Sequence, residues 1–144
     1  MHIGRDEAEN RDRRPLKFRQ VLGAYAIVRL AADAAIPGWA ANGDFTSITR
    51  TANELSIVCR TQNVPSDVDH GPCWICLKLE GPFAFSQTGI LLSFIEPLSS
   101  DGIPIFAIST YDTDYVLVQE EFADAALQVL EKAGHEVIGD IKES

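Results

Sequence analysis

Residues 103–118 read Ile-Pro-Ile-Phe-Ala-Ile-Ser-Thr-Tyr-Asp-Thr-Asp-Tyr-Val-Leu-Val. The runs Ile103–Ile108 and Tyr115–Val118 are rich in β-branched and aromatic residues, and a polar bend over residues 109–114 separates them. Two such runs joined by Ser, Thr and Asp predict a β-hairpin.

This hairpin has a counterpart earlier in the chain. Residues 48–58 align with residues 108–118 without a gap, at an offset of 60. A second pair of apolar runs, Tyr25–Leu30 and Trp74–Leu79, aligns at an offset of 49. The second copy therefore has 11 more residues between the two windows, enough for about three helical turns. We interpret the chain as two related units, of which the first is shortened.

The second unit predicts a strand over Trp74–Leu79 followed by a helix. Apolar residues recur there at helical spacing: Ile90, Leu91, Phe94, Ile95 and Leu98. Ser86 or Thr88 is available as the N-cap of this helix, Pro97 is expected to kink its end, and Asp101-Gly102 terminates it.

A second helix is predicted after the hairpin, beginning near Glu120. Its apolar face comprises Phe122, Ala125, Ala126, Val129, Leu130 and Ala133. Gly134 ends this helix, and residues 137–141 form a closing strand. The order βαββαβ predicts an α+β, ferredoxin-like unit with both helices on one face of an antiparallel sheet.

The first unit has little room for helices, since only residues 36–43 and 63–68 lie where they would fall. We therefore predict a charged tail over residues 1–19, an N-terminal unit with short helices over residues 20–72 and a C-terminal unit over residues 73–144. The sheets of the two units can pair edge to edge or pack face to face, and the sequence does not decide between these arrangements.

The charge distribution excludes some classes of partner. The chain has 144 residues, 46% apolar content and a net charge of −9. Residues 1–19 carry six basic and four acidic side chains, so the remaining chain carries a charge of −11 and repels nucleic-acid phosphates. The basic tail is expected to be solvated, although contact with an anionic partner stays open. No apolar run is long enough to span a membrane, and the first residues have no signal-peptide pattern, so we expect a cytoplasmic protein.

The cysteines give weak evidence for a metal or redox site. Cys73 and Cys76 have a C-x-x-C spacing, but residues i and i+3 of a strand point to opposite faces, and no second such pair exists. We expect these cysteines and Cys59 to pack as small apolar side chains, with no metal and no cofactor. No nucleophile is spaced with a base and there is no phosphate-binding loop, so we predict no catalytic residue and no enzyme.

The polar bend can instead bind an amino acid. An ammonium group needs carboxylates, which Asp112 and Asp114 supply, and a carboxylate needs hydroxyls or free backbone N–H groups. Gln87 and Thr88 stand where a helix begins, and Gly89 lets a ligand approach the main chain. The alternative is that Asp and Thr here are ordinary turn residues that bond their own backbone.

The residues also carry a family resemblance. Glu80-Gly-Pro-Phe, Thr88-Gly-Ile-Leu and the run 102–118 resemble the tandem ACT-domain proteins related to the cytosolic arginine sensors, the CASTOR-type family, over roughly residues 20–140. ACT domains are regulatory modules that bind amino acids where two of them meet. By position, the resemblance implies ligand contacts from Gln87, Gly89, Thr110, Tyr111 and Asp114. The sensors carry a glutamate at the position of Gln87, so the resemblance does not extend to arginine as the ligand.

We therefore expect a non-catalytic sensor that binds a small molecule, an amino acid, between its ACT units. A homodimer is expected, because ACT units expose sheet edges that pair readily and two-fold dimers are the commonest closed form. The alternative is a structural or protein-interaction module that has lost ligand binding, and the shortened first unit favours it.

Overall fold

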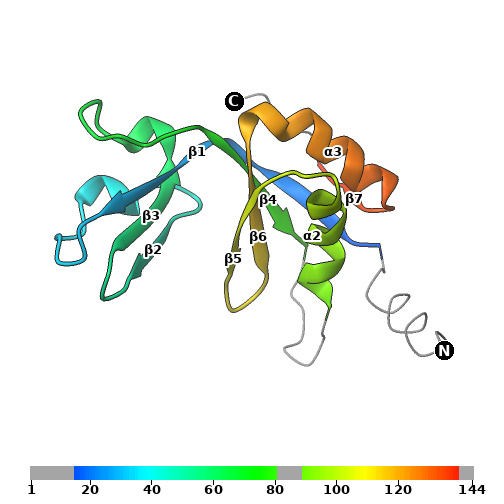
Figure 1. Ribbon diagram of the computed structural model, residues 1–144, viewed down its shortest axis with the longest axis horizontal. Helices are drawn as coiled ribbons and strands as arrows, with labels where there is room; N and C mark the ends of the chain where they lie inside the picture. The colour runs from blue at the N-terminus through cyan, green and yellow to red at the C-terminus, as the bar shows by residue number, and fades with distance from the viewer. Residues whose placement is uncertain (1–14, 81–88, 140–144) are drawn as a thin grey trace.

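The computed structural model describes residues 15–80 and 89–139 (Figure 1). Its elements are, in chain order, β1 (Lys17–Leu30), η1 (Gly38–Ala41), β2 (Ser47–Arg50), β3 (Leu55–Arg60), η2 (Thr61–Asn63), β4 (Trp74–Leu79), α2 (Ile90–Ser100), β5 (Ile105–Ser109), β6 (Asp114–Gln119), η3 (Glu120–Phe122), α3 (Ala123–Lys132) and β7 (Glu136–Val137). The fold is α+β and ferredoxin-like, as predicted.

The strands form one continuous sheet with the order β2-β3-β1-β4-β6-β5, and β7 pairs with β1 off this path. This order is symmetric about the β1–β4 pair: β1 corresponds to β4, β3 to β6 and β2 to β5. Antiparallel pairing of β1 with β4 joins the two halves, with Phe18 opposite Leu79 and Val21 opposite Cys76. Of the two arrangements that the sequence left open, the sheets are therefore joined edge to edge.

Strand β1 is longer than predicted and belongs to both halves. Its first part pairs with β4, and its second part, from Tyr25 onward, pairs with β3. A bulge separates these parts between Val21 and Tyr25, and Gly23 within it has φ +103°, which other residues rarely adopt. Because β1 begins at Lys17, the last residues of the expected tail lie in the sheet, and Phe18 among them is buried in the core.

The closing strand differs from the prediction. A closing strand over residues 137–141 was expected, whereas the observed strand is Glu136–Val137 and pairs in parallel with Lys17 and Phe18 of β1. In a ferredoxin-like unit the last strand would lie beside the first, which is β4 here. The physical reason is that the first part of β1 already occupies that edge of β4. Residues 140 and 141 lie outside the described part of the chain.

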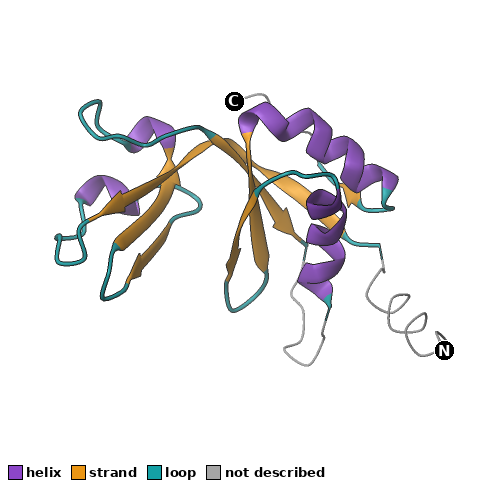
Figure 2. Ribbon diagram, viewed as in Figure 1, coloured by secondary structure: helices purple, strands orange, loops and turns teal. Residues whose placement is uncertain are grey.

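Helices α2 and α3 cover one face of the sheet, as Figure 2 shows. They bury a core with Phe94 and Leu98 from α2 and with Ala126 and Leu130 from α3. The apolar face of α3 was partly misassigned: Ala125 and Ala133 are exposed, and Leu127 packs against the core instead.

The start of α2 also differs from the prediction. Its N-cap is Gly89, at φ +78° and without a side-chain hydrogen bond, whereas Ser86 or Thr88 was expected. Ser86 and Thr88 both lie outside the described residues.

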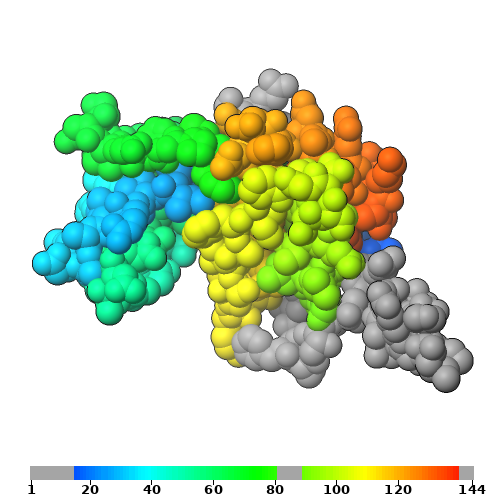
Figure 3. Space-filling model, in the orientation of Figure 1, coloured from blue at the N-terminus to red at the C-terminus, as the bar shows by residue number. Residues whose placement is uncertain are grey.

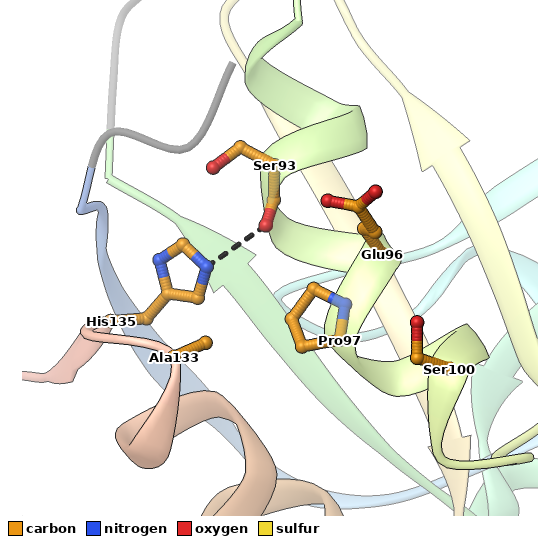
Figure 4. Close-up of a pocket in the computed structure, with 6 residues that line it drawn as sticks. All are labelled: Ser93, Glu96, Pro97, Ser100, Ala133 and His135. Carbon is orange, nitrogen blue, oxygen red and sulfur yellow. Dashed lines mark hydrogen bonds between the residues drawn. The ribbon is translucent and has the colours of Figure 1, made fainter. Parts of the chain in front are cut away.

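A buried histidine joins three elements at one end of the sheet. Pro97 has no N–H group, so the carbonyl of Ser93, four residues earlier, lacks its helical donor. The ring of His135 supplies one, because its Nε2 lies 3.0 Å from that carbonyl oxygen (Figure 4). The other ring nitrogen, Nδ1, accepts the backbone N–H of Leu16 at 3.1 Å. His135 is therefore neutral, and burial lowers its pKa.

An aromatic cluster joins the two halves on the face of the sheet away from the helices. Phe45, from the loop before β2, stacks on Tyr115 of β6 with ring centroids 4.2 Å apart and meets Tyr25 edge-on at 6.0 Å. The Tyr25 side chain is fully buried, and its hydroxyl has no hydrogen-bond partner within the described residues. Burial raises the pKa of Tyr25 to about 12, so the hydroxyl stays protonated.

The hydrogen bonds of His135 predict a pH-dependent stability. The pKa of His135 is lower in the folded protein than in the unfolded chain, where it is about 6.5. The contribution of neutral His135 to stability is therefore complete above about pH 6.5 and is lost as the pH falls below that value. We expect the free energy of unfolding to fall between pH 7 and 5.5 by at most about 1.4 kcal/mol per pH unit. Urea unfolding of His135→Gln should show a smaller slope in this range, with His70→Gln as the control. An unchanged slope in His135→Gln would exclude His135 as the cause.

The orphan hydroxyl of Tyr25 predicts a stabilising substitution. A buried hydroxyl without a partner costs about 1–3 kcal/mol, so Tyr25→Phe should raise the free energy of unfolding by about 1 kcal/mol in chemical denaturation. Tyr115→Phe, at a half-buried position of the same cluster, is the control and should change it little. A clear loss of stability in Tyr25→Phe would mean that the hydroxyl has a partner.

Candidate functional site

The polar bend between β5 and β6 is closed by its own threonines. The N–H of Thr110 donates to the carbonyl of Thr113 at 2.8 Å, and the hydroxyl of Thr110 donates to the same carbonyl at 3.0 Å. The N–H of Thr113 in turn lies 3.3 Å from the hydroxyl oxygen of Thr110. Thr110 therefore performs the turn chemistry that was the alternative to ligand binding.

A second contact attaches the bend to the neighbouring strand. The hydroxyl of Thr113, which is only 6% exposed, donates to the carbonyl of Leu79 at 2.8 Å. Leu79 is the last residue of β4, from which the chain leads towards α2. The bend and the end of β4 consequently lie together at one end of the sheet (Figure 1). The sequence offered Thr113 only as one of the hydroxyls of the bend, and nothing in its local pattern identifies a bond to residue 79.

The remaining predicted residues differ in exposure. Asp114 is half-buried and its carboxylate accepts a hydrogen bond from the hydroxyl of Ser109. Asp112 is exposed, and Tyr111 is 81% exposed. Gly89 is the residue before α2. Gln87 and Thr88 lie outside the described residues.

An ion pair that the sequence did not predict lies at the same end of the sheet. The Arg19 guanidinium donates through Nε to a carboxylate oxygen of Glu80 at 2.6 Å, and the N–H of Glu80 donates to the carbonyl of Lys17 at 2.9 Å. Glu80 directly follows Leu79, so the end of β4 is held by β1 on one side and by the bend on the other.

The cysteines lie apart from this site. Cys59 and Cys76 are fully buried, and burial raises the pKa of both thiols, that of Cys76 to about 12. Such thiols are not reactive nucleophiles. Within residues 15–80 and 89–139, no three His, Cys, Asp or Glu side chains lie close enough to hold a metal ion. The described helices also include none that is long and apolar enough to cross a membrane.

Three hollows in the surface lie elsewhere. One of about 290 Å³ lies between α2 and the end of α3 and is shown in Figure 4; its lining residues are Ser93, Glu96, Pro97, Ser100, Ala133 and His135. One of about 420 Å³ lies between α3 and β7, and one of about 460 Å³ lies at the bulge of β1. None of these three is lined by residues of the bend.

Comparison with known proteins identifies the family. An ACT-domain model matches residues 69–132, and a model described as an N-terminal domain matches residues 23–67. The crystal structure of Atu0741 from Agrobacterium tumefaciens is 46% identical, covers 91% of this chain and 98% of its own, and superposes with a TM-score of 0.85. The protein belongs to the family of Atu0741 and contains an ACT domain. ACT domains generally bind small molecules such as amino acids in regulatory roles.

More distant structures share the fold of this ACT-domain protein. VC0802 from Vibrio cholerae, a protein of unknown function described as a possible transport protein, is 18% identical with a TM-score of 0.74, over 89% of this chain and 97% of that one. The aspartokinase alpha and beta subunits are 19% identical with a TM-score of 0.51, over 83% and 97%. The ACT part of the predicted resemblance is confirmed, and the CASTOR-type relationship stays a prediction.

The bond between Thr113 and Leu79 can be tested by removing one hydroxyl. Thr113→Val keeps the shape of the side chain but leaves the Leu79 carbonyl without this donor, so we expect a loss of about 1–2 kcal/mol in urea unfolding. Thr49→Val, at an exposed position of β2, is the matched control and should change stability little. Equal effects of the two substitutions would mean that the bend is not held by this bond.

Proposed function

We propose that the protein is a non-catalytic regulatory module that binds a small molecule bearing an α-amino-acid group at the polar bend. The observation that carries this proposal is the hydrogen bond from Thr113 to Leu79. It fixes the bend, with its two aspartates, beside the end of β4, from which residues 81–88 lead to the start of α2. A ligand in this region can place its ammonium group against the two aspartates and its own carboxylate at the N-terminus of α2.

The proposed contacts have separate roles. Asp114 and Asp112 bind the ammonium group, and Thr110 and Tyr111 border it. Gln87, Thr88 and Gly89 receive the carboxylate at the start of α2, where the absence of a side chain on Gly89 leaves the backbone accessible. The Asp114 carboxylate has two oxygens, and the hydrogen bond from Ser109 leaves acceptor capacity for a ligand.

We also propose that the N-terminal half is a second, shortened ACT unit and that the ligand lies between the units. The symmetric strand order supports this, as does the notch between the β2–β3 and β5–β6 hairpins that Figure 3 shows. Within the described chain β2 and β5 each have one strand neighbour, so their free edges suit pairing in a homodimer. The three cysteines are free, in keeping with the reducing cytoplasm.

One observation favours the alternative of a structural or interaction module. The hydroxyls of Thr110 and Thr113 are both used inside the protein, so they offer a ligand less than the sequence predicted. A stable dimer that responds to no amino acid would favour this second function.

The proposed function predicts a ligand-dependent melting temperature. In a thermal-shift screen of the standard amino acids, at least one should stabilise the protein, by about 2.7 kcal/mol when present at 100 times its dissociation constant. Asp114→Asn keeps an acceptor for Ser109 but removes the charge, so it should abolish this shift.

The matched control is Glu54→Gln, because Glu54 holds the corresponding place before β3. It lies 3.8 Å from Arg29 in an exposed ion pair, and its loss should leave the ligand response intact. A full response in Asp114→Asn, or an equal loss in both variants, would contradict the assignment of the ligand to the bend.

A further inference from the structure

The hollow at the bulge of β1 lies where β3 ends and β4 begins. Its lining residues are Leu22, Gly23, Ala24, Arg60, Thr61, Gln62 and Cys73, and its volume is about 460 Å³. Cys73 directly precedes β4, whereas the bend is attached to Leu79 at the other end of that strand. The hollow is therefore separate from the site of the proposed function.

The guanidinium of Arg60 lies directly over Gly23. A Cβ atom on residue 23 would lie 2.2 Å from Nε and 2.5 Å from Cζ of Arg60, closer than any real contact. The aliphatic stem of Arg60 passes close to Gly43, where an added Cβ would lie 3.6 Å from its Cγ. The glycine at the bulge thus leaves room for the guanidinium of Arg60, in addition to permitting the positive φ of residue 23.

Among the arginines that the structure describes, Arg60 differs in having no hydrogen-bonded or ion-paired partner for its side chain. Among the described residues, Arg19 pairs with Glu80, Arg29 lies near Glu54, and Arg50 donates to backbone carbonyls of the loop after β1. The Arg60 side chain is half-buried and forms no hydrogen bond or ion pair within residues 15–80 and 89–139, although its charge acts on the nearby Tyr25 hydroxyl. Withdrawing a cation from water without a partner is unfavourable, and this chain has 21 acidic residues from which a partner could have come.

We propose that this hollow binds a small carboxylate with an apolar body. A guanidinium donates two parallel N–H bonds to a carboxylate, which matches a single cation to a single negative charge. Leu22, which is 53% exposed, and Ala24 provide apolar walls for the rest of the molecule. The hydroxyl of Thr61 is directed to the sulfur of Cys73 at 3.7 Å, which leaves its oxygen lone pairs and the exposed Gln62 amide as the polar rim.

The first experiment compares three probes on the full chain by ¹H–¹⁵N NMR titration. Isovalerate carries a carboxylate on a branched apolar body, isopentylamine carries an ammonium on the same body, and inorganic phosphate has no apolar part. We expect saturable shifts of the Gly23 amide and the Arg60 Nε–H signal with isovalerate only. Saturation by the amine, equal binding of phosphate, or no response to isovalerate would overturn the proposal.

The second experiment tests Arg60 itself. Arg60→Gln should weaken isovalerate binding by about tenfold to a hundredfold, as expected for a charge-assisted hydrogen bond. Arg29→Gln removes an arginine from the same half of the chain and should leave the affinity unchanged. Unchanged affinity in Arg60→Gln, or an equal loss in both variants, would overturn the proposal.

A third variant covers the case in which Arg60→Gln does not fold. Leu22→Asp places a negative charge on an exposed wall of the hollow without disturbing the core, and it should also weaken isovalerate binding. Normal binding in Leu22→Asp would overturn the proposal. Isovalerate has no ammonium group, so Asp114→Asn should leave its binding unchanged, and the outcome is independent of whether the bend binds an amino acid.

Discussion

The pairing of β1 with β4 is the constraint on which the rest of the structure depends. In a ferredoxin-like unit the last strand lies beside the first, but here the first part of β1 takes that place next to β4. The second part of β1 pairs with β3, so a single strand of 14 residues completes the sheet of both halves. The bulge at Gly23 and the displacement of β7 onto Lys17 and Phe18 both follow from this sharing. The C-terminal half therefore has no complete sheet without the N-terminal half, because the first part of β1 serves as its strand beside β4.

The same strand pair also positions the two candidate sites. The carboxyl end of β4 receives the hydroxyl of Thr113, which fixes the polar bend of the ACT domain. The amino end of β4 follows Cys73, beside the bulge over which Arg60 lies. A change in the register of β1 against β4 would move both places at once, since a slip of one residue turns every side chain to the opposite face. In the proposed function, this geometry provides a direct route by which the two candidate sites can influence each other through one rigid element.

The sequence predicted what depends on local periodicity and missed what depends on distant contacts. The hairpins and the helices α2 and α3 were predicted because the spacing of apolar residues over a short stretch of sequence distinguishes strands from helices. The beginning of β1 was not found, because its polar residues and Gly23 hide a strand whose partners lie about 60 residues away. The role of His135 was missed for the same reason: it needs a proline on α2 to free the Ser93 carbonyl and the backbone of Leu16 to donate to the ring. Arg60 has no local sequence signal, since it is distinguished by a side chain that forms no ion pair within the described part of the chain.

The internal hydrogen bonds of the bend bear on both of its interpretations. A turn whose hydrogen-bonding groups are all used within the turn cannot bind a ligand. In this bend, different residues close the turn and retain free acceptors. The threonine hydroxyls close the turn and attach it to Leu79, whereas the Asp114 carboxylate receives one bond and retains further lone pairs. A binding group held by packing and by hydrogen bonds from its neighbours loses less entropy when a ligand arrives than one on a free loop. The same contacts that make Thr110 and Thr113 structural residues therefore hold the bend around Asp114 in place, as the proposed recognition of an ammonium group requires.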